Sequence, residues 1–182
     1  MTGVEHEGAS RRRALRLGLA GLAGLLVPAR PAAATDARIL ALRSLHTGEF
    51  VRATYWAAGR YVRDGLTAID RVLRDHRSDT VHPIDRRLLD VLATLRDRLE
   101  TQEPFEVVSG YRSPATNAHL VASTSGVASR SLHVAGMAVD IRVPGRSLQA
   151  VRDAAKALRA GGVGYYPASS FVHVAVGRVR YW

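Results

Sequence analysis

Two histidines and an aspartate stand out in this sequence because apolar residues surround them. His133 and Asp140 lie within the segment SLHVAGMAVDI, and His173 lies within FVHVAV. A bare carboxylate on an apolar strand is costly unless something compensates its charge. A zinc ion would do so, because imidazole nitrogen and carboxylate oxygen are common zinc ligands. For His173 taken alone, a hydrogen-bonded core histidine is the alternative interpretation.

Two histidines and one aspartate would fill three positions of a tetrahedral zinc site and leave the fourth for water. Open sites of this kind are catalytic, because zinc lowers the pKa of the bound water and polarises a carbonyl group. The chain has no cysteine, which excludes thiolate zinc sites, disulfides and cysteine nucleophiles. The sequence therefore predicts a hydrolase with one zinc ion per chain, held by imidazole and carboxylate.

The segment from 109 to 140 contains most of the residues that could do chemistry. It predicts a tight turn, a short helix that begins at Ser113-Pro114, a Ser/Gly-rich loop at 123–131 and a strand at 137–143. Arg112, in the turn, carries the guanidinium group that binds anions well. It could hold an anionic group of a substrate, and a buried salt bridge is the alternative.

Hydrophobic periodicity outlines the scaffold around this segment. Strands are expected at 49–56, 61–62, 105–108, 163–166, 171–176 and 179–182, and amphipathic helices at 64–75, 85–100 and 147–159. Residues 38–44 are expected to form only a short apolar lead-in. Since no repeat and no linker divides the chain after residue 34, we predict a single domain over residues 35–182.

The first 34 residues predict an export signal. The segment SRRRALR carries paired arginines and resembles a twin-arginine signal, which delivers folded proteins. The apolar run at 17–27 is too short to span a bilayer, and Ala32-Ala33-Ala34 has the pattern of a signal-peptidase site. An ordinary secretory signal is the alternative. We expect a mature chain without a membrane span, exported to the periplasm or cell envelope.

The net charge of +10 indicates a basic surface. Such a surface favours polyanions or an anionic envelope, and a solvated basic face without a partner is the alternative. Nucleic-acid binding requires more than charge. The sequence has no recognised binding motif and no basic run interleaved with aromatic residues, so we expect no nucleic-acid partner. We expect the protein to be a monomer.

Three separated segments carry a family resemblance. SGYRSPATN, SLHVAGMAVDI and GGVGYYPASSFVHVAVGRVRYW resemble the peptidase M15 group of zinc enzymes that cleave peptidoglycan peptides, and in particular its murein endopeptidase K type. The resemblance implies that His133, Asp140 and His173 are the zinc ligands. It also implies an α+β fold of the Hedgehog/DD-peptidase kind, in which helices pack around a small antiparallel sheet that carries the metal.

The same resemblance implies roles for residues near the ligands. Arg112 would contact the substrate or the oxyanion formed during attack, and its substrate would be a peptide of peptidoglycan. Ser131, two residues before the first histidine, would bind substrate or support the site. Ser113 is named beside it as a residue that could bind substrate or support the site, or could simply shape the turn and helix start.

One position departs from the pattern of the subgroup. The subgroup usually shows H-x-D in the last segment, and Ala175 stands here in place of the aspartate. Loss of such a neighbour of a metal ligand typically costs about 10–100-fold in affinity or activity. The sequence therefore does not identify a general base, for which His119 is a distant candidate. The alternative function is a binding module that keeps the pocket but has lost catalysis.

Overall fold

The computed structural model describes residues 36–124 and 128–182. The predicted signal segment, residues 1–34, lies outside the described residues. Within the described ranges no helix has the length and apolar character needed to cross a membrane.

The described residues form one eight-stranded sheet with helices packed against it, which confirms the α+β class. The strands are β1 (Arg38–Ser44), β2 (Phe50–Ala57), β3 (Arg60–Tyr61), β4 (Phe105–Ser109), β5 (Ala138–Arg142), β6 (Gly162–Tyr166), β7 (Phe171–Ala175) and β8 (Arg180–Tyr181). Their order across the sheet is β3-β2-β1-β4-β5-β7-β6-β8. The β1–β4 and β6–β8 pairs are parallel and the other pairs are antiparallel. The sheet is therefore larger than expected, and it is mixed.

Four α-helices and one short 3-10 helix complete the described part of the chain. They are α1 (Arg63–Val72), α2 (Arg86–Arg98), α3 (Pro114–Ser123), η1 (Leu132–Ala135) and α4 (Leu148–Leu158). Helices α2, α3 and α4 begin at side chains that accept a hydrogen bond from the backbone of the first turn, namely Asp85, Ser113 and Ser147. These caps satisfy N–H groups that have no partner inside the helix.

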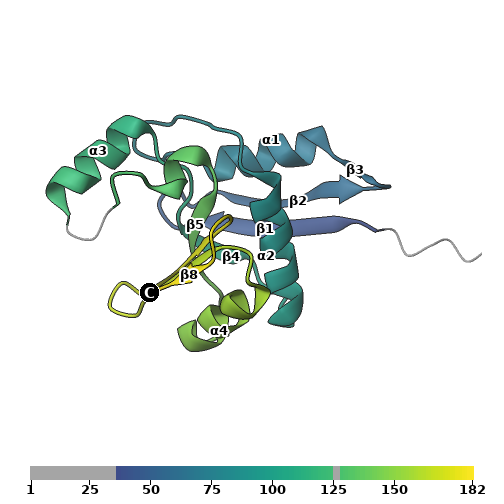
Figure 1. Cartoon of the computed structure of the whole chain (residues 1–182). Coiled ribbons are helices and arrows are strands. Elements are labelled where there is room, and N and C mark those ends of the chain that lie inside the picture. The colour runs from purple at the N-terminus through teal and green to yellow at the C-terminus, as the bar shows by residue number, and fades with distance from the viewer. Residues whose placement is uncertain (1–35, 125–127) are drawn as a thin grey trace, which may run out of the picture. The chain divides into compact units, whose positions relative to one another are not determined.

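The hydrophobic core lies between the helices and one face of the sheet. Helices α2 and α4 contact each other (Figure 1). Helix α2 also contacts β1, and helix α4 contacts β6 and β7. The leucine stripe of α2 is buried together with Val139 and Ile141 of β5 and Val172 and Val174 of β7. Because side chains alternate along a strand, the residues between these valines and isoleucine face the opposite side of the sheet.

Strand β1 is the main difference from the expected elements. Residues 38–44 were expected to form a lead-in, but they form a central strand that pairs with β2 on one side and β4 on the other. Leu40 and Leu42 are completely buried. A strand buried in the middle of a sheet has a nearly continuous apolar sequence. The parallel partner of β1 is β4, some sixty residues further along the chain, and Leu42 is aligned with Phe105.

Candidate metal centre

Asp140 and His173 are brought together by the pairing of β5 with β7. The two residues are direct cross-strand partners in the antiparallel ladder. Residues that face each other in this way project from the same face of a sheet. Their neighbours Val139 and Val174 face the core, so the carboxylate and the imidazole project from the face opposite to the core.

His133 reaches the same point from η1, which lies just before β5. The Ser131 side chain accepts a hydrogen bond from the His133 backbone N–H at 3.4 Å and begins the short helix. Gly136 ends it in the left-handed conformation with φ 64°. A Cβ at Gly136 would lie 2.6 Å from the Pro83 carbonyl oxygen, so only glycine fits there. The S-x-H-x-x-x-G pattern therefore builds the turn that places the imidazole.

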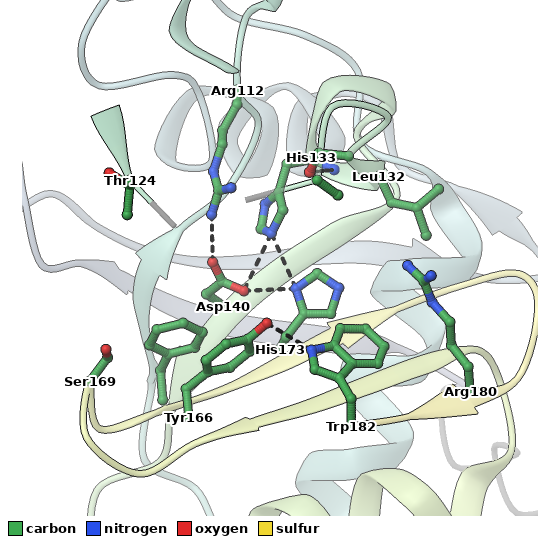
Figure 2. A pocket seen from close by; sticks show the side chains of 13 residues that line it. Arg112, Thr124, Leu132, His133, Asp140, Tyr166, Ser169, His173, Arg180 and Trp182 are labelled. Atoms are coloured by element: carbon green, nitrogen blue, oxygen red, sulfur yellow. Dashed lines mark hydrogen bonds and ion pairs between the residues drawn. The ribbon is translucent and has the colours of Figure 1, made fainter. Parts of the chain in front are cut away.

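Three ligand atoms of the three residues converge (Figure 2). The distance between His133 Nε2 and His173 Nδ1 is 3.2 Å, that between His133 Nε2 and Asp140 Oδ1 is 3.3 Å, and that between His173 Nδ1 and Asp140 Oδ1 is 2.8 Å. The side chains are 2%, 4% and 12% exposed for His133, Asp140 and His173. A buried carboxylate thus faces two imidazole nitrogens.

The donor set fits a zinc ion. Tetrahedral zinc with bonds of about 2.0–2.1 Å separates its ligand atoms by about 3.3 Å. The two distances from His133 Nε2 match this separation, and the distance of 2.8 Å between His173 Nδ1 and Asp140 Oδ1 is shorter. His133 Nδ1 lies 2.7 Å from the Gly110 carbonyl oxygen. That acceptor places the ring proton on Nδ1 and leaves the Nε2 lone pair facing the cluster. A backbone carbonyl holding the second ring nitrogen is typical of histidines that ligate metals.

The surroundings favour the protonation states that a metal requires. Burial alone would raise the pKa of Asp140, but the charge and hydrogen bonds of His133 and His173 outweigh burial and lower that pKa below its usual range. Burial lowers the pKa of His173, although Asp140 opposes this shift. An ionised carboxylate and a neutral imidazole are the forms that bind metal ions.

Arg112 holds the second oxygen of the aspartate. Its Nη2 donates to Asp140 Oδ2 at 2.7 Å, and its Nε donates to Ser109 Oγ at 2.8 Å. The Arg112 side chain is 15% exposed, and burial lowers its pKa while the charge of Asp140 raises it. Because Oδ2 is occupied by the guanidinium, Oδ1 is left to face the imidazoles. The salt bridge considered for Arg112 therefore exists, and it orients a candidate ligand.

The segment that carries Arg112 is fixed against the end of α1. Tyr111 donates its backbone N–H to the Leu73 carbonyl oxygen at 2.7 Å, and Ser113 donates its backbone N–H to Asp75 Oδ2 at 2.9 Å. Asp75 is 1% exposed. Burial alone would raise its pKa, but hydrogen bonds from Thr116, Ser113 and Arg77 outweigh burial and lower the pKa below its usual range.

We expect Asp75→Asn to lower the free energy of unfolding by about 1.5–3 kcal/mol, the usual contribution of hydrogen bonds to a charged group. Because the folded-state pKa is lowered, this contribution is present above the unfolded pKa of about 3.9 and is lost as the pH falls through the folded-state pKa. Urea unfolding from pH 7 to pH 3 should show the difference between the two proteins shrinking below about pH 4.

Asp153→Asn is a matched control for this measurement. Asp153 is 60% exposed and, within residues 36–124 and 128–182, forms an ion pair with its neighbour Arg152 alone. Its removal should therefore change the free energy of unfolding by less than about 0.5 kcal/mol at any pH. A difference between Asp75→Asn and the unmutated protein that stayed constant over this pH range would contradict the assignment.

The cluster lies in the wall of an open cavity of about 420 Å³. Arg112 and Ser131 line this cavity together with the three candidate ligands, and an aromatic wall is formed by Tyr166, Phe171 and Trp182. Such a cavity is large enough for a peptide side chain or a small ligand. Candidate ligands and substrate space are therefore adjacent.

Two other residues named from the sequence are not part of the cavity as the described residues form it. Ser113 is buried at the start of α3, where its side chain accepts from Thr116 N at 3.2 Å, so its support of the site is structural. His119 is exposed on α3. The sequence analysis did not predict the aromatic wall, because its residues follow the pattern of ordinary strand residues. The alternating glycines Gly162 and Gly164 were the available signal, since they leave one face of β6 bare.

Ala175 does not line the cavity in the described structure either. It is 2% exposed and faces Ala138 across the β5–β7 ladder.

We therefore expect Ala175→Asp to bring no gain in peptide cleavage. The same change should lower the free energy of unfolding by about 1–3 kcal/mol, because the new polar group would be buried. Cleavage assays and thermal unfolding would measure both effects. Ala150→Asp, at an exposed position in the first turn of α4, is the control, and a large rise in cleavage by Ala175→Asp would refute the expectation.

The fold and the site place this chain among α+β proteins with an open cavity over a buried His–Asp–His cluster. Residues 32–182 match the peptidase M15 family model described as peptidoglycan L,D-endopeptidase MepK. The chain belongs to that family, which confirms the resemblance drawn from the sequence.

Relatives of known name agree with the family. The chain is 42% identical to the peptidoglycan L,D-endopeptidase MepK of Escherichia coli strain K12, over 96% of this chain and 97% of the relative. It is equally similar to the Shigella flexneri protein of the same name. A probable peptidoglycan L,D-endopeptidase MepK of Haemophilus influenzae is 39% identical over 80% of this chain and 78% of its own length.

Proposed function

We propose that this protein is a zinc-dependent endopeptidase that hydrolyses an L,D-peptide bond in the cross-links of peptidoglycan during cell-wall remodelling. The observation that carries the proposal is the convergence of ligand atoms from His133, Asp140 and His173 at the wall of an open cavity. It is supported by relatives that are named peptidoglycan L,D-endopeptidases and that align over nearly the whole chain.

The chemistry that a bound zinc ion supplies is Lewis acidity, which polarises the scissile carbonyl and makes a water molecule more nucleophilic. His133, Asp140 and His173 hold the ion, and Ser131 supports His133 by capping η1. Arg112 orients Asp140 through its Nη2. Its Nη1 has no hydrogen-bond partner among the described residues, so it is free to contact the substrate or the oxyanion that forms during attack.

The proposed substrate also defines where the protein acts. Peptidoglycan lies outside the cytoplasmic membrane, so the protein must be exported, and we assign this task to residues 1–34 and the twin-arginine route. Residues 35–182 then form the mature peptidase, which acts as a monomer on peptidoglycan peptides. A binding module without catalysis is not favoured, because Ala175 is the one feature that suggested it and the cavity retains every candidate ligand.

The test uses the mature chain from Thr35, assayed for zinc content and incubated with two matched peptides. One peptide carries the L,D bond of a cross-link and the other has a D,D bond at the same place. We expect one zinc per chain, cleavage of the L,D peptide alone, and loss of cleavage after chelation. Peptidoglycan sacculi treated in parallel should lose cross-linked muropeptide dimers, as read by mass spectrometry.

The possible outcomes separate the parts of the proposal. Zinc bound without cleavage of either peptide would contradict the enzyme and favour the binding module. Cleavage of the D,D peptide alone would contradict the assigned bond, and a chain that takes up no zinc would contradict the metal centre.

A further inference from the structure

Strand β6 presents an unusual face to the cavity. Gly164 is the direct partner of His173 in the β6–β7 ladder, so Gly162, Gly164 and Tyr166 project from the same side of the sheet as the candidate metal ligand. Two of these three positions have no side chain. The face of β6 beside His173 is therefore flat up to Tyr166.

The indole ring of Trp182 occupies this flat surface. A Cβ at Gly164 would lie 2.7 Å from two indole atoms, Cε2 and Nε1, and a Cβ at Gly162 would lie 3.3 Å from two others. The backbone of Trp182 is held to the same strand by hydrogen bonds of 2.9 Å from Tyr165 N and of 3.2 Å to Val163 O. A side chain at Gly164 would displace the indole, and one at Gly162 would press against it.

The position of the indole orients the hydroxyl group of Tyr166. Trp182 Nε1 donates to Tyr166 Oη at 2.7 Å, and the centre of the indole lies 5.4 Å from the centre of the His173 ring (Figure 2). On its other side, Tyr166 stacks on Phe171 with ring centres 4.6 Å apart. The tyrosine ring is thus held between a stacking partner and a hydrogen-bond donor.

This arrangement leaves the phenol proton of Tyr166 available. An indole N–H can only donate, so it occupies a lone pair of Oη and cannot accept the phenol proton. No acceptor for that proton exists among the described residues, and Tyr166 lines the cavity. A hydroxyl that accepts one hydrogen bond is polarised and becomes a better donor of another.

We propose that Tyr166 is a further catalytic residue, which donates a hydrogen bond to the carbonyl oxygen of the scissile peptide bond, and that Trp182 is its positioning residue. The interaction strengthens as the carbonyl oxygen becomes negative during attack, so it stabilises the transition state more than the bound substrate. No proton is transferred, since the phenol keeps its proton throughout. The inference rests on the proposed endopeptidase function.

The first test compares Tyr166→Phe with the unmutated protein on the L,D peptide. The variant keeps the ring that stacks on Phe171 and removes only the hydroxyl. We expect kcat to fall by about 100-fold, as for removal of an oxyanion donor, with KM changed by less than about twofold and zinc content unchanged. Tyr165→Phe is the matched control, because Tyr165 is the next residue and faces the other side of the sheet; it should leave kcat unchanged.

A double-variant cycle tests the positioning role. Trp182→Phe keeps an aromatic ring over the glycines but removes the N–H donor, and we expect it to lower kcat by about tenfold. In Tyr166→Phe the same change at Trp182 should have almost no further effect, because residues that act through one another are not additive. Independent, multiplying losses would overturn the positioning role.

A binding measurement keeps the inference testable apart from turnover. Trp56 and Trp182 are the two tryptophans of the chain, so Trp56→Phe leaves Trp182 as the single tryptophan, whose fluorescence reports on the cavity. In that background, a peptide with a phosphinate in place of the scissile amide should bind about 100-fold more weakly after Tyr166→Phe, because the phosphinate oxygen imitates the oxyanion.

The outcomes distinguish the two proposals. If the unmutated protein cleaves the L,D peptide and Tyr166→Phe cleaves it equally fast, the role of Tyr166 is overturned and the endopeptidase stands. If the unmutated protein cleaves neither peptide, the endopeptidase falls, and phosphinate binding decides about Tyr166. Equal binding by both proteins, or no binding by either, overturns the hydroxyl contact.

Discussion

Asp140→Asn is expected to abolish zinc binding and peptide cleavage together. The aspartate supplies one of three convergent ligand atoms through Oδ1 and receives Arg112 through Oδ2. An amide in its place has no negative charge for the ion, and it leaves the guanidinium without its partner. Because loss of a residue that merely touches a ligand costs about 10–100-fold, we expect zinc affinity to fall by more than about 100-fold. The value of kcat/KM should fall by about 1,000-fold or more.

Zinc titration by competition with a chelator, and kinetics on the L,D peptide, would measure these effects. Circular dichroism must show that the variant is folded, because an unpaired buried guanidinium is destabilising. Asp97→Asn serves as the control, since Asp97 is 66% exposed and pairs with the adjacent Arg96; it should bind zinc and cleave normally. A folded Asp140→Asn protein that retained one tightly bound zinc would rule out the proposed metal centre.

Gly110→Ala is expected to damage both the fold and the site. A Cβ at Gly110 would lie 2.3 Å from the Leu73 carbonyl oxygen, so α1 and the segment before Arg112 would have to separate. The Gly110 carbonyl oxygen also accepts from His133 Nδ1 at 2.7 Å. We expect the free energy of unfolding to fall by about 3 kcal/mol, and zinc affinity to fall by about 10–100-fold because the imidazole loses its orientation.

Urea unfolding and zinc titration of the same preparation would test this expectation. Gly145→Ala is the matched control: Gly145 has a left-handed backbone with φ 71° but no atom within 4 Å of the added methyl group. Its replacement should cost about 1 kcal/mol of backbone strain and leave zinc affinity unchanged. If Gly110→Ala behaved like Gly145→Ala in both measurements, the contact between Gly110 and α1 would be unimportant.

The elements that could be predicted are those whose signals are local. The apolar stripes of α2 and α4 lie within the helices that they define, and these helices occur where the sequence predicted them. Strand β1 could not be recognised in this way, because its apolar run is explained by burial in the middle of the sheet, next to a parallel strand far away in the sequence. Helix η1 is four residues long, which is too short for any periodicity.

The same distinction applies to the site. Asp140 and His173 could be singled out because a polar residue in an apolar strand is conspicuous wherever its partner lies. The double role of Arg112 could not be read from the sequence, since its contact with Asp140 spans 28 residues. Tyr166 and Trp182 carry no such contrast. The role proposed for them rests on a ring that fills the space left by two glycines, and that packing is visible only in three dimensions.

The direct pairing of Asp140 with His173 would also make metal binding at the proposed centre depend on the register of β5 and β7. A slip of one residue between β5 and β7 would turn one of the two side chains to the opposite face, while the strand content would hardly change. A misaligned preparation would then look normal by circular dichroism and yet contain less than one metal ion per chain. The number of metal ions per chain should therefore report whether the two strands are paired in the correct register. A cell that loads the ion before export would then export mainly the correctly folded molecules.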